Sequence, residues 1–217
     1  MCKTIVCYGD SNTWGYIPGV ASRFPKSKRW TGVCQDLLGE GFEVVEEGLN
    51  GRATIYDDPF NPYLNGKRGL GYSLISKKPI DLVVLFLGTN DLKFTDAHGA
   101  AKGIEELVEL ILNADSTYIV SQPIFPNGVK ILLVSPAVVA PEIEYVRPES
   151  LVAGKSQETL KFSLLYEQIA KKYGVYFLDA ALYAKPSLAD CVHIDADGHQ
   201  LLGTAIAAKI KEIFTDN

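Results

Sequence analysis

Three side chains of this sequence could together perform nucleophilic chemistry: Ser11, His193 and Asp190. A serine hydroxyl is a poor nucleophile at neutral pH, so it needs a nearby base, and a histidine with its ordinary pKa of ~6.5 suits that task. The imidazole in turn needs an acceptor on its other nitrogen, which fixes the tautomer and stabilises the cation that forms. Asp190 lies three residues before His193 and can reach it across one turn. These residue types therefore predict a Ser-His-Asp catalytic triad.

The same chemistry requires hydrogen-bond donors for the negatively charged oxygen that forms when a hydroxyl attacks an acyl carbon. Losing one such donor typically slows an enzyme ~10²–10³-fold. Gly51 offers an unhindered backbone N–H, Asn90 a side-chain amide, and Ser11 its own backbone N–H. We therefore expect these three residues to form an oxyanion hole. The candidates to line a substrate pocket beside it are Asp10, Trp14, Ile17 and Asn50.

The elements that would position these side chains follow from the apolar pattern, in which β-rich runs alternate with stripes at helical spacing. The expected strands cover residues 4–8, 42–46, 80–87, 130–134 and 175–178. The expected helical stripes consist of Trp30, Val33, Leu37 and Leu38, ended by Gly39; of Ile104, Leu107, Val108, Ile111 and Leu112; of Leu160, Leu164, Leu165 and Ile169; and of Leu201, Ala205, Ile206, Ile210 and Ile213. With right-handed crossovers this pattern predicts a three-layer α/β/α sandwich around a five-stranded parallel sheet.

Small polar clusters follow the first three expected strands, at residues 9–11, 48–51 and 88–91. In an open parallel sheet the carboxyl ends of the strands lie along one rim, where ligands bind. These clusters are therefore expected to converge, and the loop with residues 190–193 could fold over the same rim. Three long segments rich in Pro, Gly, Asn or Asp are expected to be surface loops, and loops of this length often shape a ligand site. They are residues 16–28, 55–71 and 114–128.

Length and composition favour one soluble globular domain spanning residues 1–217, since 47% of the residues are apolar and 22% are charged. The net charge is −5 and no cluster of Lys and Arg offers a stripe to phosphates, which argues against a nucleic-acid partner. The N-terminus lacks the pattern of a signal peptide, and no apolar run approaches the ~18 residues that cross a bilayer. We therefore expect a cytoplasmic protein without membrane contact.

The cysteines and the acidic segment after His193 raise the question of metal binding. The four cysteines are scattered and lack Cys-x-x-Cys spacing, so reduced structural thiols are the better interpretation. Asp195, Asp197 and His199 could join His193 in a metal site, but their spacing matches no familiar zinc site and would compete with the triad. We expect no metal, and we expect His199 to cap or pack against the last helix.

The polar clusters also resemble the sequence blocks of the SGNH (GDSL) hydrolases. Segment 9–15 (Gly-Asp-Ser-Asn-Thr-Trp-Gly) resembles the first block, Asn50-Gly51 falls where the second has its glycine, 88–91 resembles the third, and 190–193 resembles the Asp-x-x-His fifth block. The blocks occur in family order and span nearly the whole chain. Through segments 29–32, 46–49 and 57–59 the sequence looks closest to the arylesterase and acyltransferase branch. It departs from the family at Asn12, where an aliphatic residue is common, and in the approximate second block at 50–52.

This resemblance implies a flavodoxin-like SGNH hydrolase fold and a serine esterase that hydrolyses short-chain aryl or alkyl esters through an acyl-enzyme. Some relatives transfer the acyl group to an alcohol, some assemble into homo-oligomers, and no cofactor is implied. The same triad would also suit a carbohydrate O-acetylesterase, a thioesterase or a lysophospholipase. Two further alternatives are a metal hydrolase and a non-catalytic α/β module that binds a small ligand at the strand ends.

Overall fold

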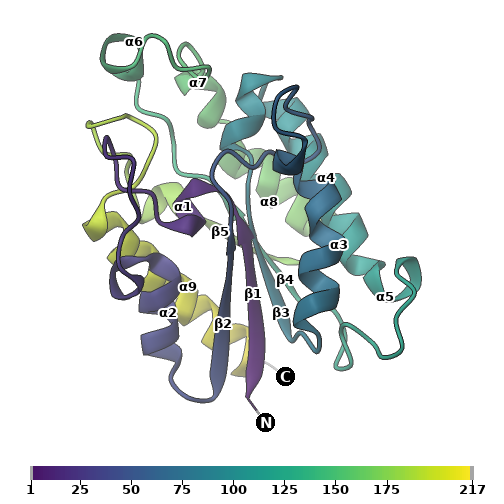
Figure 1. Cartoon of the computed structure of the whole chain (residues 1–217). Helices are drawn as coiled ribbons and strands as arrows, with labels where there is room; N and C mark the ends of the chain where they lie inside the picture. The colour runs from purple at the N-terminus through teal and green to yellow at the C-terminus, as the bar shows by residue number, and fades with distance from the viewer. Residues whose placement is uncertain (1, 216–217) are drawn as a thin grey trace.

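A five-stranded parallel sheet organises the molecule. A computed structural model describes residues 2–215, and its strands lie in the order β2-β1-β3-β4-β5 (Figure 1). They are β1 (Lys3–Gly9), β2 (Phe42–Gly48), β3 (Leu82–Phe86), β4 (Ile131–Ser135) and β5 (Tyr176–Asp179). Every neighbouring pair in this order is parallel. The five predicted strands are thus confirmed, with ends that differ by one or two residues.

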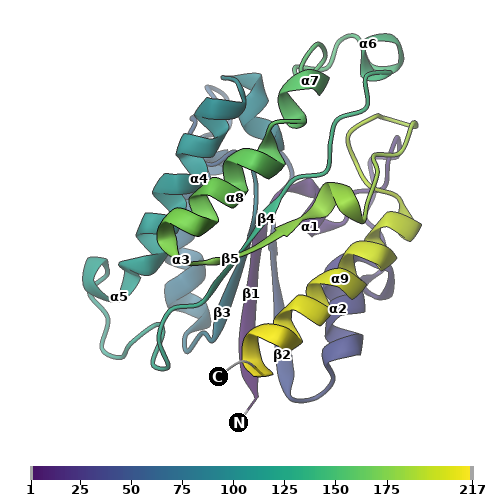
Figure 2. The ribbon, with the colours of Figure 1, turned by 180° about the vertical axis from the view of Figure 1, so that it is seen from behind.

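Helices cover both faces of the sheet. Those on one face are α3 (Gly66–Lys77), α4 (Ala97–Leu112) and α8 (Phe162–Tyr173), and those on the other are α2 (Trp30–Leu38) and α9 (Ala196–Thr215) (Figure 2). Successive side chains of a strand point to opposite faces. Val6 and Tyr8 of β1 therefore pack in the core beneath the first set, whereas Ile5 and Cys7 pack beneath the second. The predicted three-layer α/β/α sandwich is confirmed.

Short helical segments complete the connections between these elements. The α-helical turns are α1 (Ser11–Trp14), α5 (Ala114–Thr117), α6 (Ile143–Val146) and α7 (Ser156–Thr159). The 3₁₀ segments are η1 (Lys26–Lys28), η2 (Pro62–Leu64), η3 (Thr89–Lys93) and η4 (Ala180–Leu182). Two of them, α1 and η3, begin shortly after the carboxyl ends of β1 and β3 and carry predicted site residues.

Local signals explain where the longer helices begin and end. The side chain of Asp96 accepts the N–H of Gly99 at 2.9 Å and caps the first turn of α4. Gly174 follows α8 in the left-handed conformation, with φ of 64°, which favours glycine. Gly39 directly follows α2, so the predicted end of this helix is confirmed.

The prediction of a loop over residues 55–71 is wrong at its end, because α3 begins at Gly66. The side chain of Asn65 accepts the N–H of Arg68 at 3.3 Å and caps this helix. A Cβ atom on Gly66 would lie 2.6 Å from the carbonyl oxygen of Ala53, in the segment that follows β2. Only glycine therefore lets the start of α3 approach this segment so closely. Glycines in the first turns hid the helix, because they weaken the helical signal in a sequence.

Two of the predicted helical stripes are confirmed only in part. Leu160, Leu164 and Leu201 were expected to be buried, but they are 61%, 61% and 58% exposed. Ile169, Ile206, Ile210 and Ile213 are buried as predicted. The other core positions of α8 and α9 are Phe162, Tyr166, Ala170, Leu202 and Ala207. Both helices carry apolar residues on more than one face, so spacing alone could not select the buried one.

The segment 114–128 lies at the opposite end of the sheet from the strand carboxyl ends (Figure 1). The N–H of Ile80, two residues before β3, donates to the carbonyl of Ile124 at 2.8 Å. The carboxylate of Asp115 accepts the N–H groups of Ile124 and Phe125 and closes this loop. Of the three long segments, this one therefore does not shape a site at the rim. None of the helices within residues 2–215 is both long and apolar enough to span a bilayer.

Candidate active site

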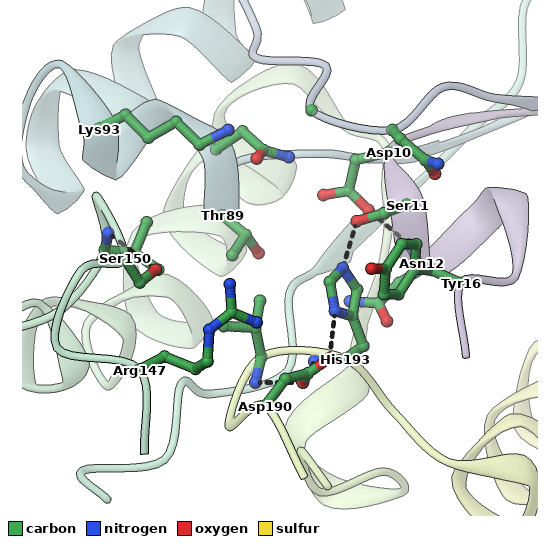
Figure 3. Close-up of a pocket in the computed structure, with 15 residues that line it drawn as sticks. Asp10, Ser11, Asn12, Tyr16, Thr89, Lys93, Arg147, Ser150, Asp190 and His193 are labelled. Atoms are coloured by element: carbon green, nitrogen blue, oxygen red, sulfur yellow. Dashed lines mark hydrogen bonds and ion pairs between the residues drawn. The ribbon is translucent and has the colours of Figure 1, made fainter. Parts of the chain in front are cut away.

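A cavity of about 260 Å³ opens at the carboxyl ends of β1 and β3 (Figure 3). The chain leaves β1 toward β2 at one side and returns across β1 to β3 at the other, so β1 and β3 flank the point where the strand order reverses. Ligand sites of parallel α/β sheets lie at such a point. The predicted convergence of residues 9–11, 48–51, 88–91 and 190–193 is observed, since all four segments contribute to the cavity wall.

Ser11 is the first residue of α1, immediately beyond the end of β1. The side chain of Asp10 accepts the N–H of Asn12 at 3.0 Å and caps this turn, which agrees with the expected anchoring role of Asp10. Gly9 permits the tight packing, because a Cβ atom there would lie 2.8 Å from the carbonyl oxygen of Phe86 on the neighbouring strand. This sharp strand-to-helix turn directs the serine hydroxyl into the cavity.

A chain of hydrogen bonds joins Ser11, His193 and Asp190 (Figure 3). Nδ1 of His193 lies 2.8 Å from Oδ2 of Asp190, and Nε2 lies 2.9 Å from Oγ of Ser11. A carboxylate can only accept, so Nδ1 carries the hydrogen, and in the neutral ring Nε2 is then free to accept the serine O–H. The arrangement can take a proton from the serine.

The carboxylate of Asp190 is held by four N–H donors. Besides the ring of His193, it accepts the backbone N–H of Val192 at 3.1 Å, that of His193 at 2.9 Å and that of Gly19 at 3.0 Å. Burial alone would raise its pKa, but the hydrogen bonds and the nearby imidazole outweigh burial and lower the pKa to about 2. Asp190 is therefore ionised at neutral pH, as an acceptor for His193 must be.

The loop that carries His193 is fixed from several sides. Cys191 adopts a φ of 65°, rare for a residue other than glycine, and its carbonyl accepts the N–H of Ala140 at 2.9 Å. The ring of Tyr16 stacks on the imidazole of His193, with 4.3 Å between ring centroids. Cys191, which directly follows Asp190, is thus a buried structural thiol.

The three predicted oxyanion donors, Ser11, Gly51 and Asn90, all line the cavity. Nδ2 of Asn90 donates one hydrogen to the carbonyl of Arg52 at 3.2 Å, which fixes the amide and leaves its second hydrogen for a ligand. Within residues 2–215, no protein acceptor takes the backbone N–H of Ser11 or Gly51. These N–H groups are available to a negatively charged oxygen.

Two buried charged residues that the sequence analysis did not single out hold the segment around Gly51. The guanidinium of Arg52 donates to the carbonyl oxygens of Gly9, at 2.9 Å, and Glu47. The carboxylate of Asp91 accepts the backbone N–H of Thr54 at 3.1 Å and its hydroxyl. Burial raises the pKa of Asp91 to about 7 even though the bonds from Thr54 lower it. The position of Asp91 in the polar cluster 88–91 was the one feature of the sequence that could have marked it as part of the site.

The remaining walls of the cavity differ in part from the prediction. Asp10 and Asn50 line it as expected. Trp14 and Ile17 do not: Trp14 lies under the guanidinium of Arg23, and Ile17 belongs to an adjacent turn. Tyr16 takes their place, because side chains of neighbouring residues in a turn point in different directions. Burial raises the pKa of Asp10 to about 6.

Residues from η3 and from the segment before α7 close the side opposite His193 (Figure 3). Lys93, Arg147 and Ser150 face the cavity there and were not predicted. No sequence motif marked them, since they follow the recognisable blocks or lie far from them in the chain. Burial lowers the pKa of Lys93, with nearby carboxylates opposing that effect. This wall is polar and carries positive charge.

The residues considered for metal binding do not converge. Within residues 2–215 no three His, Cys, Asp or Glu side chains are grouped so that they could hold a metal ion. His199 points away into the core, where its Nδ1 accepts the N–H of Trp30 at 3.1 Å, so the expected packing role is confirmed. All four cysteines are free thiols, with Cys2 exposed and the others buried.

A parallel α/β fold with hydrogen-bonded serine, histidine and aspartate at the strand ends defines a class of hydrolases. A model of the GDSL-like lipase/acylhydrolase family matches residues 7–201, and the chain belongs to this family. It is a carboxylic ester hydrolase of the SGNH (GDSL) type, so the resemblance noted in the sequence is confirmed. No curated protein matches the sequence.

Solved structures of similar proteins share the whole fold. The native aryl esterase of M. smegmatis is 34% identical over 97% of this chain and 99% of its own, with a TM-score of 0.87. Est24, a carbohydrate acetylesterase from Sinorhizobium meliloti, is 34% identical over the same shares, with a TM-score of 0.88. A lipase/acylhydrolase from Enterococcus faecalis shares the fold at 20% identity over 97% of this chain and 96% of its own, with a TM-score of 0.67.

Proposed function

We propose that this protein is a serine esterase for short-chain acyl esters, with Ser11 as nucleophile, His193 as general base and Asp190 as its partner. The observation that carries the proposal is the continuous hydrogen-bond chain of 2.9 Å and 2.8 Å from hydroxyl to imidazole to carboxylate, beside unpaired N–H donors. A binding module would have no use for this alignment, whereas acyl transfer to serine needs each part of it.

In the first half of the reaction, Oγ of Ser11 attacks the carbonyl carbon while Nε2 of His193 takes the hydroxyl proton. The π electrons of the carbonyl move onto its oxygen, giving a tetrahedral intermediate. When they return, the bond to the alcohol oxygen breaks, and His193 gives that oxygen its proton. An acyl group remains on Ser11 and an alcohol leaves. Asp190 stabilises the imidazolium that exists between the two proton transfers.

In the second half, His193 removes a proton from water, whose oxygen attacks the acyl carbon. The bond from that carbon to Oγ of Ser11 then breaks, His193 returns the proton to Oγ, and a carboxylic acid leaves. An alcohol that enters in place of water would leave as a new ester, so acyl transfer uses the same groups. The negatively charged oxygen of each intermediate is stabilised by the N–H groups of Ser11 and Gly51 and by the Asn90 amide.

The size and polarity of the cavity guide the choice of ester. A volume of about 260 Å³ suits a small acyl group and a modest alcohol. The wall with Asn50, Lys93 and Ser150 offers hydrogen bonds to hydroxyl groups, which favours a second candidate, a carbohydrate O-acetylesterase like the neighbour Est24. Rates on p-nitrophenyl esters of increasing acyl length, compared with acetylated sugars, separate the two candidates: a sugar ester preferred over p-nitrophenyl acetate supports the second.

The nucleophile is tested by labelling with a fluorophosphonate probe followed by peptide mapping. We expect a single adduct on Ser11 in the wild type and none in Ser11→Ala. The variant should keep the melting temperature of the wild type, because the lost hydroxyl bonds only His193, and should lose activity about 10⁴-fold or more. An unlabelled wild type, or a Ser11→Ala variant with undiminished turnover, would reject the proposal.

A further inference from the structure

Asn12 stands at the position of the first block where an aliphatic residue is common in the family, and its side-chain oxygen is hydrogen-bonded in the structure. It directly follows Ser11 and is 4% exposed. Its Oδ1 accepts the backbone N–H of Ile194 at 3.1 Å, in a hydrogen bond that spans 182 residues of sequence. Ile194 in turn directly follows His193. The bond therefore joins the neighbour of the serine to the neighbour of the histidine.

Both ends of this bond are attached to rigid structure. The backbone N–H of Asn12 donates to the carboxylate of Asp10 at 3.0 Å, which fixes Asn12 in the turn α1. Ile194 is fully buried in the core between the sheet and α9. Since neither end can move freely, the length of this one bond restricts how far the histidine loop can shift relative to Ser11.

A second backbone-to-side-chain hydrogen bond between the same two segments is placed less favourably. The N–H of Gly19 donates to Asp190 at 3.0 Å, but Gly19 lies on an exposed turn eight residues beyond the serine. Asn12 instead acts one residue from each reacting group, and Figure 3 shows it beside Ser11 at the edge of the cavity. A displacement of about 1 Å at a reacting group can cost ~10²-fold in rate. A hydrogen bond next to both Ser11 and His193 can therefore strongly affect the rate of proton transfer between them.

We propose that Asn12 is a positioning residue that holds Nε2 of His193 in line with Oγ of Ser11 through its bond to the Ile194 N–H. The proposal rests on the proposed esterase function. Without Oδ1 of Asn12, the buried N–H of Ile194 has no acceptor, which costs free energy. This cost favours conformations in which the loop with His193 moves outward, so that the N–H can bond to water. The departure from the family pattern then has a purpose: an amide at this position supplies an acceptor that an aliphatic side chain cannot.

The test compares Asn12→Leu, which keeps the side-chain size but removes the acceptor, with Thr159→Val. Thr159 is a matched control because its buried hydroxyl also accepts a backbone N–H, that of Val139, at 3.1 Å, and it does not line the cavity. We expect Asn12→Leu to lower kcat and the rate of fluorophosphonate labelling about 10-fold, with a smaller change in KM. Thr159→Val should lower the melting temperature but leave both rates near those of the wild type.

Two further measurements separate positioning from a general loss of structure. The downfield proton NMR signal of the His193–Asp190 hydrogen bond should broaden in Asn12→Leu and stay sharp in Thr159→Val. Asn12→Asp keeps an acceptor oxygen at the same place and adds a negative charge that favours the imidazolium, so its labelling rate should exceed that of Asn12→Leu. An Asn12→Leu variant that labels as fast as the wild type, or an Asn12→Asp variant as impaired as Asn12→Leu, overturns the role of Asn12. Failure of the esterase proposal is distinguishable, because the wild type itself would then remain unlabelled.

Discussion

His193 and His199 lie six residues apart in the chain, yet their surroundings are opposite. His193 stands in the wall of the cavity with both ring nitrogens hydrogen-bonded to side chains. His199, near the start of α9, is fully buried and meets the ring of Phe24 edge-on at 5.3 Å. Its Nδ1 accepts the N–H of Trp30, the first residue of α2, and within residues 2–215 its buried Nε2 has no partner.

The difference shows that the partner of Nδ1 decides what a histidine can do: a carboxylate in His193 and a backbone N–H in His199. Asp190 gives His193 a negative charge to face when it takes up a proton, and the proposed mechanism needs this change of charge. His199 can hold the start of α2 only while Nδ1 is unprotonated, since a protonated nitrogen could not accept the N–H of Trp30. Burial lowers the pKa of His199 to about 4, and the carboxylate of Asp195 offsets only part of that effect.

The largest expected effect separates the two rings by activity. His193→Ala should lower kcat/KM for p-nitrophenyl acetate about 10⁵-fold, because it removes the ring nitrogen that lies 2.9 Å from the Ser11 hydroxyl, while the melting temperature stays close to that of the wild type. His199→Asn should remain near wild-type activity at pH 8, since its side chain faces the core and not the cavity. Steady-state kinetics and thermal melting of both variants provide the comparison.

Added imidazole sharpens this comparison. The cavity left by His193→Ala opens to solvent, so a free imidazole can enter and restore part of the activity, whereas it has no place to act in His199→Asn. The proposed roles would be wrong if His193→Ala remained active, or if His199→Asn lost as much activity as His193→Ala in a folded protein.

The sequence could predict the parts of the site that depend on local patterns. Ser11, Asn90 and His193 stand in short polar clusters at strand ends or before a helix, and the parallel fold brings such clusters together. Gly51, which lines the cavity and which we propose as an oxyanion donor, was found in the same way. For these residues, the type of the side chain and the position of its element were sufficient.

Contacts between distant segments could not be predicted from such patterns. Arg52 holds the ends of β1 and β2 through carbonyl oxygens, and nothing in its neighbours indicates that its guanidinium is buried. The bond from Trp30 to His199 depends on how α2 packs against α9. Tyr16 was passed over in favour of Trp14 for the pocket because the direction of a side chain in a turn is set by backbone angles, which the residue types leave open.

A smaller effect tests the other half of the comparison, the stability that His199 gives at neutral pH. In the folded protein this imidazole stays neutral down to a pKa of about 4, whereas in the unfolded chain it takes up a proton below pH ~6.5. The unfolded state therefore binds more protons between these values, and the wild type should lose about 3 kcal/mol of unfolding free energy from this group as the pH falls from 6.5 to 4. His199→Asn can still accept the Trp30 N–H but does not titrate.

Urea unfolding of the wild type and His199→Asn between pH 4 and 7.5 measures this contribution. Asp10 and Asp91, whose pKa values are raised to about 6 and about 7, act in the opposite direction, since their protonation favours the folded state as the pH falls. Both carboxyl groups are present in each protein, so the difference between the two curves isolates His199. We expect the wild type to be the more stable protein at pH 7.5 and the gap to shrink toward pH 4. A gap that stays constant with pH would mean that His199 is protonated as easily in the folded protein as in the unfolded chain, and the contrast with His193 would fail.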